Sequence, residues 1–188
     1  MISRATVLNL SLTKGLVLQR YKNIVIYLNK MSDKKIGAGC LFTNGKLTLA
    51  GLQRKCGQMV ISGIGGKRNE GEGPHENAMR ETIEELFDIA EVSKELIDLL
   101  VREFLPMKMY GTATYTFYVY SFEDLHKLLA IVSTKITSSL YDNFPSTISD
   151  LVLNRKYDTR SELPILCLVP VSQNLSFDPY FVDDINVL

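Results

Sequence analysis

Three glutamates that lie close together in the sequence could form a metal site. Glu81, Glu84 and Glu85 share one face of any helix, because successive helical residues turn by about 100°. The opposite face is apolar and carries Met79, Ile83 and Leu86. Carboxylates this close repel and raise one another's pKa, so a fold keeps them together when divalent cations sit among them. Ligand sets made only of oxygen suit hard ions such as Mg²⁺ or Mn²⁺, which also bind phosphate oxygens.

The flanking residues predict how this helix is positioned. Pro74 fits a first helical turn, where its missing N–H costs nothing, and Glu76 suits the positive end of the helix dipole. We therefore expect a helix from Pro74 to about Ile89. Ahead of it, the glycine-rich residues 63–66 let the backbone approach a ligand closely and adopt positive φ angles, which predicts a glycine loop.

The same stretch matches a known signature. Residues 66–85 resemble the signature of the Nudix hydrolase superfamily, which spaces a glycine, a glutamate, an Arg-Glu pair and a Glu-Glu pair. The matching positions are Gly66, Glu72, Arg80, Glu81, Glu84 and Glu85. Thr82 stands at an apolar position, while Phe87 and Asp88 replace the closing glycine and the apolar residue after it. The last two departures affect the turn that leaves the helix, where we expect Phe87 to pack inward.

The resemblance implies a fold and a metal-dependent activity. The implied fold class is α+β, a Nudix-like α/β/α sandwich with a mixed central sheet, and the implied cofactor is Mg²⁺ or Mn²⁺. The implied metal ligands are the carbonyl of Gly65 and the carboxylates of Glu81, Glu84 and Glu85. Either Glu81 or Glu84 would act as general base. Arg80 is expected to pair with a carboxylate of the signature, Glu72 first of all, and so to keep the cluster in register.

Further site residues are expected outside this core. Proteins of this kind often take one more acidic ligand from just before a late strand, and Glu162 precedes the strand expected at residues 165–169. A solvated loop glutamate is the alternative there, and Asp124 and Asp158 are rival ligands. Gly66, Lys67 and Arg68 are candidates for phosphate binding, whereas the alternative for the two cations is a solvated loop charge.

Other conspicuous residues have structural interpretations. His75 and His126 are expected at the surface or at helix caps rather than as metal ligands. An aromatic group could form a wall that stacks a base, but alternating aromatic residues in a strand are more often core. Its members are Tyr110, Tyr115, Phe117 and Tyr118.

Composition bounds the class of protein. The chain has 188 residues, 46% hydrophobic and 22% charged, which suits one domain over residues 1–188. Its 21 basic and 21 acidic residues argue against a strongly electrostatic nucleic-acid binder. The scattered cysteines, Cys40, Cys56 and Cys167, suit reduced thiols of an intracellular protein. We find no signal peptide or spanning segment, and expect no membrane contact and a cytoplasmic location, the nucleus or a virus-infected cytoplasm being alternatives.

The rest of the chain is assigned by pattern. Two strands at 4–10 and 16–28 would form an N-terminal hairpin within residues 1–30. A hairpin at 41–52 would turn at Asn44-Gly45. Further strands are expected at 59–62, 104–109, 112–121 and 165–169, and a second amphipathic helix at 92–102. Helices at 122–133 and 136–153, interrupted near Pro145, would form a helical insertion at 122–160, serving as a lid near the substrate or as a partner or dimer surface.

Three functions follow as hypotheses. The first is a Nudix-type pyrophosphohydrolase that cleaves a diphosphate linkage in a nucleoside diphosphate derivative, a nucleotide-type small molecule. The second is an RNA 5′-cap hydrolase of the kind large DNA viruses encode, which the long insertion favours and the balanced charge weakens. The third is a non-catalytic nucleotide-binding module, which the complete set of signature glutamates disfavours. Monomer and homodimer are both compatible with these functions.

Overall fold

The structure is a computed structural model that describes residues 36–55, 57–112 and 114–171. The hairpin predicted within residues 1–30, the tail from residue 172 and Cys56 lie outside the described residues. No helix in the described part of the chain is both long enough and apolar enough to cross a membrane.

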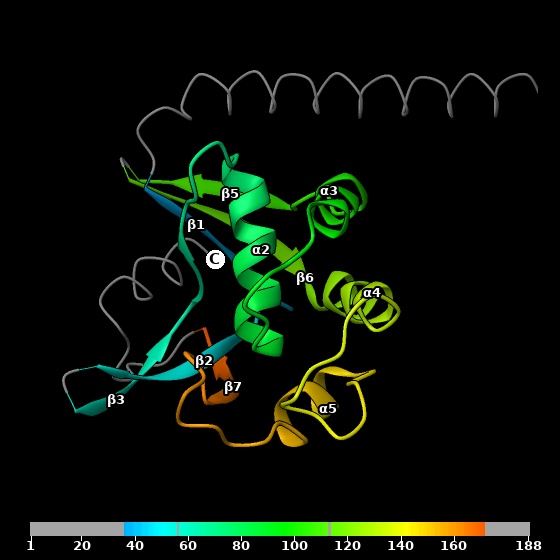
Figure 1. Cartoon of the computed structure of the whole chain (residues 1–188). Helices are drawn as coiled ribbons and strands as arrows, with labels where there is room; N and C mark the ends of the chain where they lie inside the picture. The colour runs from blue at the N-terminus through cyan, green and yellow to red at the C-terminus, as the bar shows by residue number, and fades with distance from the viewer. Residues whose placement is uncertain (1–35, 56, 113, 172–188) are drawn as a thin grey trace, which may run out of the picture. The chain divides into compact units, whose positions relative to one another are not determined.

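A mixed seven-stranded sheet organises the described residues (Figure 1). Its strands are β1 (Gly37–Thr43), β2 (Leu47–Lys55), β3 (Gln58–Ser62), β4 (Ile64–Lys67), β5 (Lys108–Gly111), β6 (Tyr115–Ser121) and β7 (Ile165–Pro170). The order is β3-β2-β1-β6-β5, with β4 beside β1 and β7 beside β2. Strands β1 and β6 are parallel, and the other pairs are antiparallel. The predicted α+β class with a mixed central sheet is confirmed.

Four helices of the described residues cover one face of this sheet. They are α2 (Pro74–Phe87), α3 (Lys94–Glu103), α4 (Phe122–Val132) and α5 (Ile148–Leu153), and Figure 1 shows α2 lying across the strands. All four contribute to one apolar cluster, to which alternate β1 residues Ala38, Cys40 and Phe42 also belong. Leu41 belongs instead to a second cluster with Val119 and Val169. The second helical layer of the expected α/β/α sandwich is not among the described residues.

The turn between β1 and β2 forms as predicted, although the two strands soon separate. The side-chain oxygen of Asn44 accepts hydrogen bonds from the backbone N–H groups of Lys46 and Leu47, and Gly45 has a φ of 81°. Beyond the pair Thr43 and Thr48, β2 pairs with β7, whereas β1 takes β4 on that side. The turn of the predicted hairpin at 41–52 is therefore confirmed, but most residues of β2 pair with strands other than β1.

Several predicted elements need correction. The glycine loop is the short strand β4, because residues 64–67 pair with β1. The helix expected at 136–153 begins only at Ile148, where Thr147 caps it. Residues 134–147 form turns and bends instead. The strand expected at 104–109 starts at Lys108, since Phe104 caps the end of α3.

The end of α2 is buried under the segment 122–160. The helix ends at Phe87 rather than near Ile89, because Asp88 adopts a left-handed conformation with φ 54°. Phe87 is fully buried, as predicted, and stacks on Phe144 with ring centroids 4.8 Å apart. The segment 122–160 thus packs on the domain as expected, and it supplies part of the core that closes α2.

Candidate functional site

Helix α2 is buried on its acidic face as well as on its apolar face. Its apolar residues Met79, Ile83 and Leu86 have no exposed surface. On the other side, Glu81 is only 9% exposed and Glu85 only 5% exposed. The carboxylates are therefore not a solvated helix face, and their charges need compensation from the protein or from a ligand.

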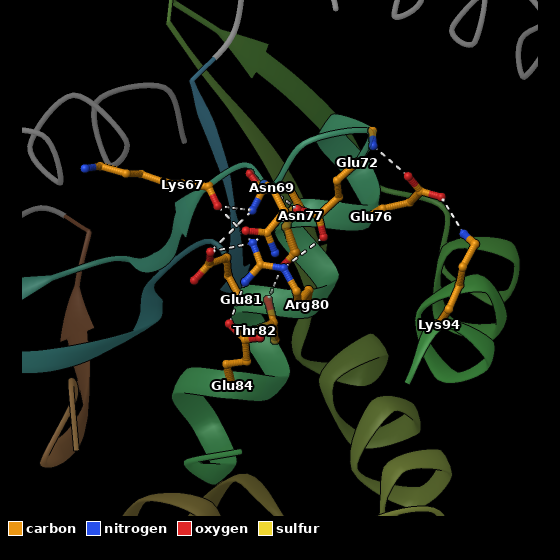
Figure 2. Close-up of polar contacts among 12 residues, drawn as sticks. Lys67, Asn69, Glu72, Glu76, Asn77, Arg80, Glu81, Thr82, Glu84 and Lys94 are labelled. Carbon is orange, nitrogen blue, oxygen red and sulfur yellow. Dashed lines mark hydrogen bonds and ion pairs between the residues drawn. The ribbon is translucent and has the colours of Figure 1, made fainter. Parts of the chain in front are cut away.

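Arg80 connects the carboxylates of the site (Figure 2). Its guanidinium donates to Glu72 over 2.9 Å and to Glu81 over 2.7 Å, and it also pairs with Glu84. A further hydrogen bond reaches the carbonyl of Lys67 in β4 over 2.9 Å. Burial lowers the pKa of Arg80, but the contacts with Glu72 and Glu81 outweigh it and raise the pKa above its ordinary value. The predicted pairing of Arg80 with Glu72 is confirmed.

Glu85 is the most enclosed carboxylate of the site. Its side chain accepts a hydrogen bond of 2.7 Å from the backbone N–H of Gly65. Burial raises the pKa of Glu85 well above its ordinary value, an effect that the Gly65 N–H and the charge of Arg155 oppose and that Glu162 and Glu81 reinforce. Among the residues that the structure describes, no cationic side chain forms an ion pair with it. Glu85 is thus a buried acid held by one backbone amide.

The other two glutamates of the helix are also perturbed. Burial raises the pKa of Glu81, and the charges of Glu84 and Glu162 add to this effect while Arg80 opposes it. Burial likewise raises the pKa of Glu84, with Arg80 opposing and Glu72 and Glu162 reinforcing it. A raised pKa makes each of these carboxylates a stronger base than an ordinary glutamate, which suits a general base.

Of the three acidic candidates outside the signature, Glu162 is the one whose charge contributes to the raised pKa values of the helix glutamates. Its charge acts on Glu81, Glu84 and Glu85 alike, and its carboxylate accepts a hydrogen bond of 3.1 Å from Gln53. The Asp124 carboxylate instead accepts hydrogen bonds from the backbone N–H and hydroxyl of Ser121 at the start of α4, and Asp158 pairs with Arg160. Both rivals therefore have structural partners elsewhere.

The positions of Gly65 and Gly66 in β4 require glycine because neighbouring side-chain and backbone atoms leave no room for a Cβ. The carboxylate of Glu81 lies where a Cβ on Gly66 would sit, and Gly65 has a φ of 147°. A side chain on Gly65 would also meet the Tyr115 hydroxyl and the Ala38 carbonyl. The glycines thus allow close packing of the strand β4 against Glu81 and β1, whereas the predicted close approach to a ligand stays a prediction.

The two cations beside these glycines are placed differently from Arg80. Lys67 is exposed, and Figure 2 shows its side chain extending away from the carboxylates, while its carbonyl accepts from Arg80. Arg68 is half-buried, and its backbone N–H donates to the Ile36 carbonyl over 2.8 Å. Their role toward phosphate stays a prediction.

Two residues of the site were not predicted from the sequence. Asn77 is fully buried, and its amide donates to the Lys67 carbonyl over 3.1 Å and to Glu81 over 3.4 Å. Arg155 donates to the carbonyl of Glu85 over 2.9 Å, to that of Leu86, and to that of Leu163 over 2.7 Å. It thereby joins the end of α2 to the loop that carries Glu162. The position of Asn77 within the signature could have indicated its role, whereas nothing near Arg155 in the sequence could have.

Most of the strand aromatics considered for a base-stacking wall are core residues. Tyr118 is 1% exposed and belongs to the cluster beneath the helices. Tyr110 and Phe117 pack against the second cluster on the other face of the sheet. The core interpretation of these strand aromatics is therefore confirmed for these three residues.

His75 provides a prediction about acid stability. Its ring stacks on Tyr118 at 4.6 Å and bonds the Tyr120 hydroxyl at 2.6 Å, so it is not a simple surface or capping residue, unlike the exposed His126. Burial lowers the pKa of His75 from 6.5 to about 4, with Glu76 opposing. Because the unfolded chain then binds more protons at His75 than the folded one, the protein becomes less stable as the pH falls. The contribution of neutral His75 to the free energy of unfolding is complete above pH 6.5 and is lost toward pH 4. We expect a loss of up to about 3 kcal/mol by urea unfolding.

A variant isolates this contribution of His75. His75→Gln cannot be protonated, so the difference in unfolding free energy between wild type and variant should shrink as the pH falls through this window. A difference that stays constant across the window would show that His75 does not titrate between the folded and unfolded states.

The donor set of the site fits a hard divalent cation in its chemistry. All candidate ligands are oxygens, and the carboxylates outnumber the single guanidinium of Arg80 that pairs with them. In addition, the buried Asn77 Oδ1 beside Glu81 has no hydrogen-bond partner in the described residues. In the described part of the chain, however, no three His, Cys, Asp or Glu side chains converge closely enough to hold a metal ion. Arg80 holds Glu81 and Glu84, while Glu85 bonds Gly65. The metal-ligand set therefore stays a prediction.

Comparisons with known proteins give distant structural likenesses. No family model matches the chain, and no curated protein matches it. A crystal structure of a NUDIX-family hydrolase from Clostridium perfringens has a TM-score of 0.36 and 13% identity, over 83% of this chain and 99% of that one. A bifunctional NMN adenylyltransferase/ADP-ribose pyrophosphatase from Francisella tularensis, complexed with AMP and a Mn ion, has a TM-score of 0.33 and 11% identity over 87% of this chain. The match spans 42% of that second protein. At similarities this low, a functional assignment has to come from the site itself.

Proposed function

We propose that the chain is a Nudix-type hydrolase that cleaves a diphosphate linkage in a nucleotide-type substrate with the help of Mg²⁺ or Mn²⁺. One observation supports this above all: Glu85 is buried beside Glu81, Glu84 and Glu162, and Arg80 balances only part of their charge. A protein gains nothing in stability from burying such a set, so a functional reason for it is expected.

Under this proposal each residue has a defined role. Glu81, Glu84, Glu85, Glu162 and the Gly65 carbonyl would hold the cations, which neutralise phosphate oxygens and lower the pKa of the attacking water. Arg80 and Glu72 orient the carboxylates, since their paired hydrogen bonds fix both side chains. Either Glu81 or Glu84 accepts the proton of the water, because both have a raised pKa.

The proposal is tested by a substrate panel. Nucleoside triphosphates, oxidised nucleotides, ADP-ribose, dinucleoside polyphosphates and capped RNA are each incubated with Mg²⁺, with Mn²⁺ or with EDTA. Metal-dependent release of a phosphorylated product from any small nucleotide supports the proposal. Turnover of capped RNA alone, with salt-dependent affinity, would favour the cap hydrolase instead. Binding without turnover under all conditions would favour the non-catalytic module. Domain extent, oligomeric state and compartment stay predictions.

Metal binding should also be visible in thermal stability. Because divalent cations relieve the repulsion among the buried carboxylates, saturating Mg²⁺ or Mn²⁺ should stabilise the folded state by about 2.7 kcal/mol at one hundred times the dissociation constant. For a chain of this size this corresponds to a rise in Tm of about 5–10 °C. Differential scanning fluorimetry measures it, with Glu85→Gln as the variant in which the rise should be smaller. An equal rise in both proteins would place the cations elsewhere.

A further inference from the structure

A hollow of about 220 Å³ lies next to the carboxylates and shares Glu162 with them. It is formed where strands β2 and β3 meet the loop that precedes β7, and Gln53, Arg54, Met59 and Tyr157 are among its lining residues. Pockets that take whole drug-sized ligands span about 300–1,000 Å³, so this hollow suits one part of a ligand.

Two exposed apolar side chains from separate segments line the hollow. Tyr157 is 60% exposed and comes from the loop after α5, whereas Met59 is 39% exposed and comes from β3. A tyrosine ring offers a flat face on which another ring can stack, and a methionine thioether adapts its shape to a flat partner. Tyr157 and Met59 together therefore suit the binding of a planar ring.

Polar groups complete the lining. Gln53 lines the hollow, and its side-chain amide donates to Glu162 over 3.1 Å, while its side-chain carbonyl is a hydrogen-bond acceptor. Arg54 adds donors whose fork matches paired acceptors on the edge of a ring, as on a purine. An apolar face with donors and acceptors at its edge is the chemistry that recognises a nucleobase.

We propose that this hollow binds the nucleobase of the substrate, with Tyr157 as the residue on which the base stacks. This inference rests on the proposed function, because the hollow shares Glu162 with the proposed cation site, where the phosphates of the same substrate would bind. It adds a residue outside the signature that determines affinity for the nucleoside part of the substrate.

Binding without catalysis tests the proposal. Nucleoside monophosphates are titrated in EDTA by NMR up to millimolar concentration, with ribose 5-phosphate as a ligand that lacks the base. Tyr157→Ala should weaken binding of at least one nucleotide about tenfold, since base stacking on an aromatic side chain has an effect of this order. Tyr157→Phe should retain the affinity, and ribose 5-phosphate should not distinguish the proteins.

A control variant separates stacking from general damage. Leu153→Ala also removes an exposed apolar side chain, 79% exposed, on the helix that precedes the loop, and it should bind nucleotides as the wild type does. In hydrolysis, Tyr157→Ala should raise KM about tenfold and leave kcat near the wild-type value. Unchanged nucleotide affinity in Tyr157→Ala, or no nucleotide binding by the wild type, overturns the proposal.

The two proposals fail in different experiments. If the wild type hydrolyses no phosphoanhydride with any metal but Tyr157→Ala still loses nucleotide affinity, the hollow stands and the hydrolase assignment falls. If metal-dependent hydrolysis is present while Tyr157→Ala binds normally, the hydrolase assignment stands and the base lies elsewhere.

Discussion

Glu85→Gln is expected to lower metal-dependent hydrolysis by at least about 100-fold while the fold remains intact. The amide oxygen of glutamine can still accept the hydrogen bond from Gly65, so the local packing is conserved. The variant loses only the buried negative charge, which the proposal assigns to cation binding. Steady-state turnover with Mg²⁺ and with Mn²⁺ measures the effect.

The same variant should behave in the opposite way in stability measurements without metal. Because the folded-state pKa of Glu85 is raised, the folded protein binds more protons than the unfolded chain, and stability falls as the pH rises above the ordinary value of 4.5. Glu85→Gln removes this loss, so in EDTA at pH 8 it should be at least as stable as the wild type. Glu95 is an exposed glutamate on α3, so Glu95→Gln is the matched control and should change neither the turnover nor the stability. A folded Glu85→Gln variant with normal turnover would remove Glu85 from the site.

Phe87→Ala is expected to destabilise the protein by about 3–5 kcal/mol. Phe87 has no exposed surface, and it stacks on Phe144 and lies against Tyr141 at a centroid distance of 6.2 Å. Its removal leaves a cavity where the end of α2 meets the segment 122–160. For a chain of this length the change corresponds to a fall in Tm of about 6–20 °C, measured by circular dichroism.

The matched control for Phe87 is Leu105→Ala, whose side chain is 49% exposed and which should change the Tm little. Arg80 lies in the middle of α2 and Glu72 lies before its first residue, so their contacts do not involve the Phe87 side chain, and the folded Phe87→Ala variant should retain the Mg²⁺ stabilisation. A variant as stable as the wild type would mean that Phe87 does not close the core.

Local chemistry explains what the sequence could predict. The start of α2, the turn at Asn44 and the contact between Arg80 and Glu72 depend on residues within a few turns of one another. Glu162 is a candidate from the resemblance because it stands just before the recognisable strand β7, and its role as a ligand stays a prediction. Such features need no knowledge of distant parts of the chain.

The missed features depend on residues far apart in sequence. Residues 64–67 are a strand only because β1 lies beside them, and residues 134–147 follow the buried end of α2 instead of their own helical pattern. The hollow at Tyr157 joins three segments, and Arg155 reaches back 70 residues to Glu85. Periodicity and turn chemistry carry no information about such partners.

The reach of Arg155 has a consequence for how the protein is made. On a ribosome that adds about 5–20 residues per second, α2 is synthesised roughly 4–14 s before the arginine that binds its last carbonyls. During that interval the carbonyls of Glu85 and Leu86 lack this partner, and the nascent helix end is open to water or to chaperones. The acidic helix is synthesised early, but the position of Glu162 relative to it is set only when the later part of the chain has been made.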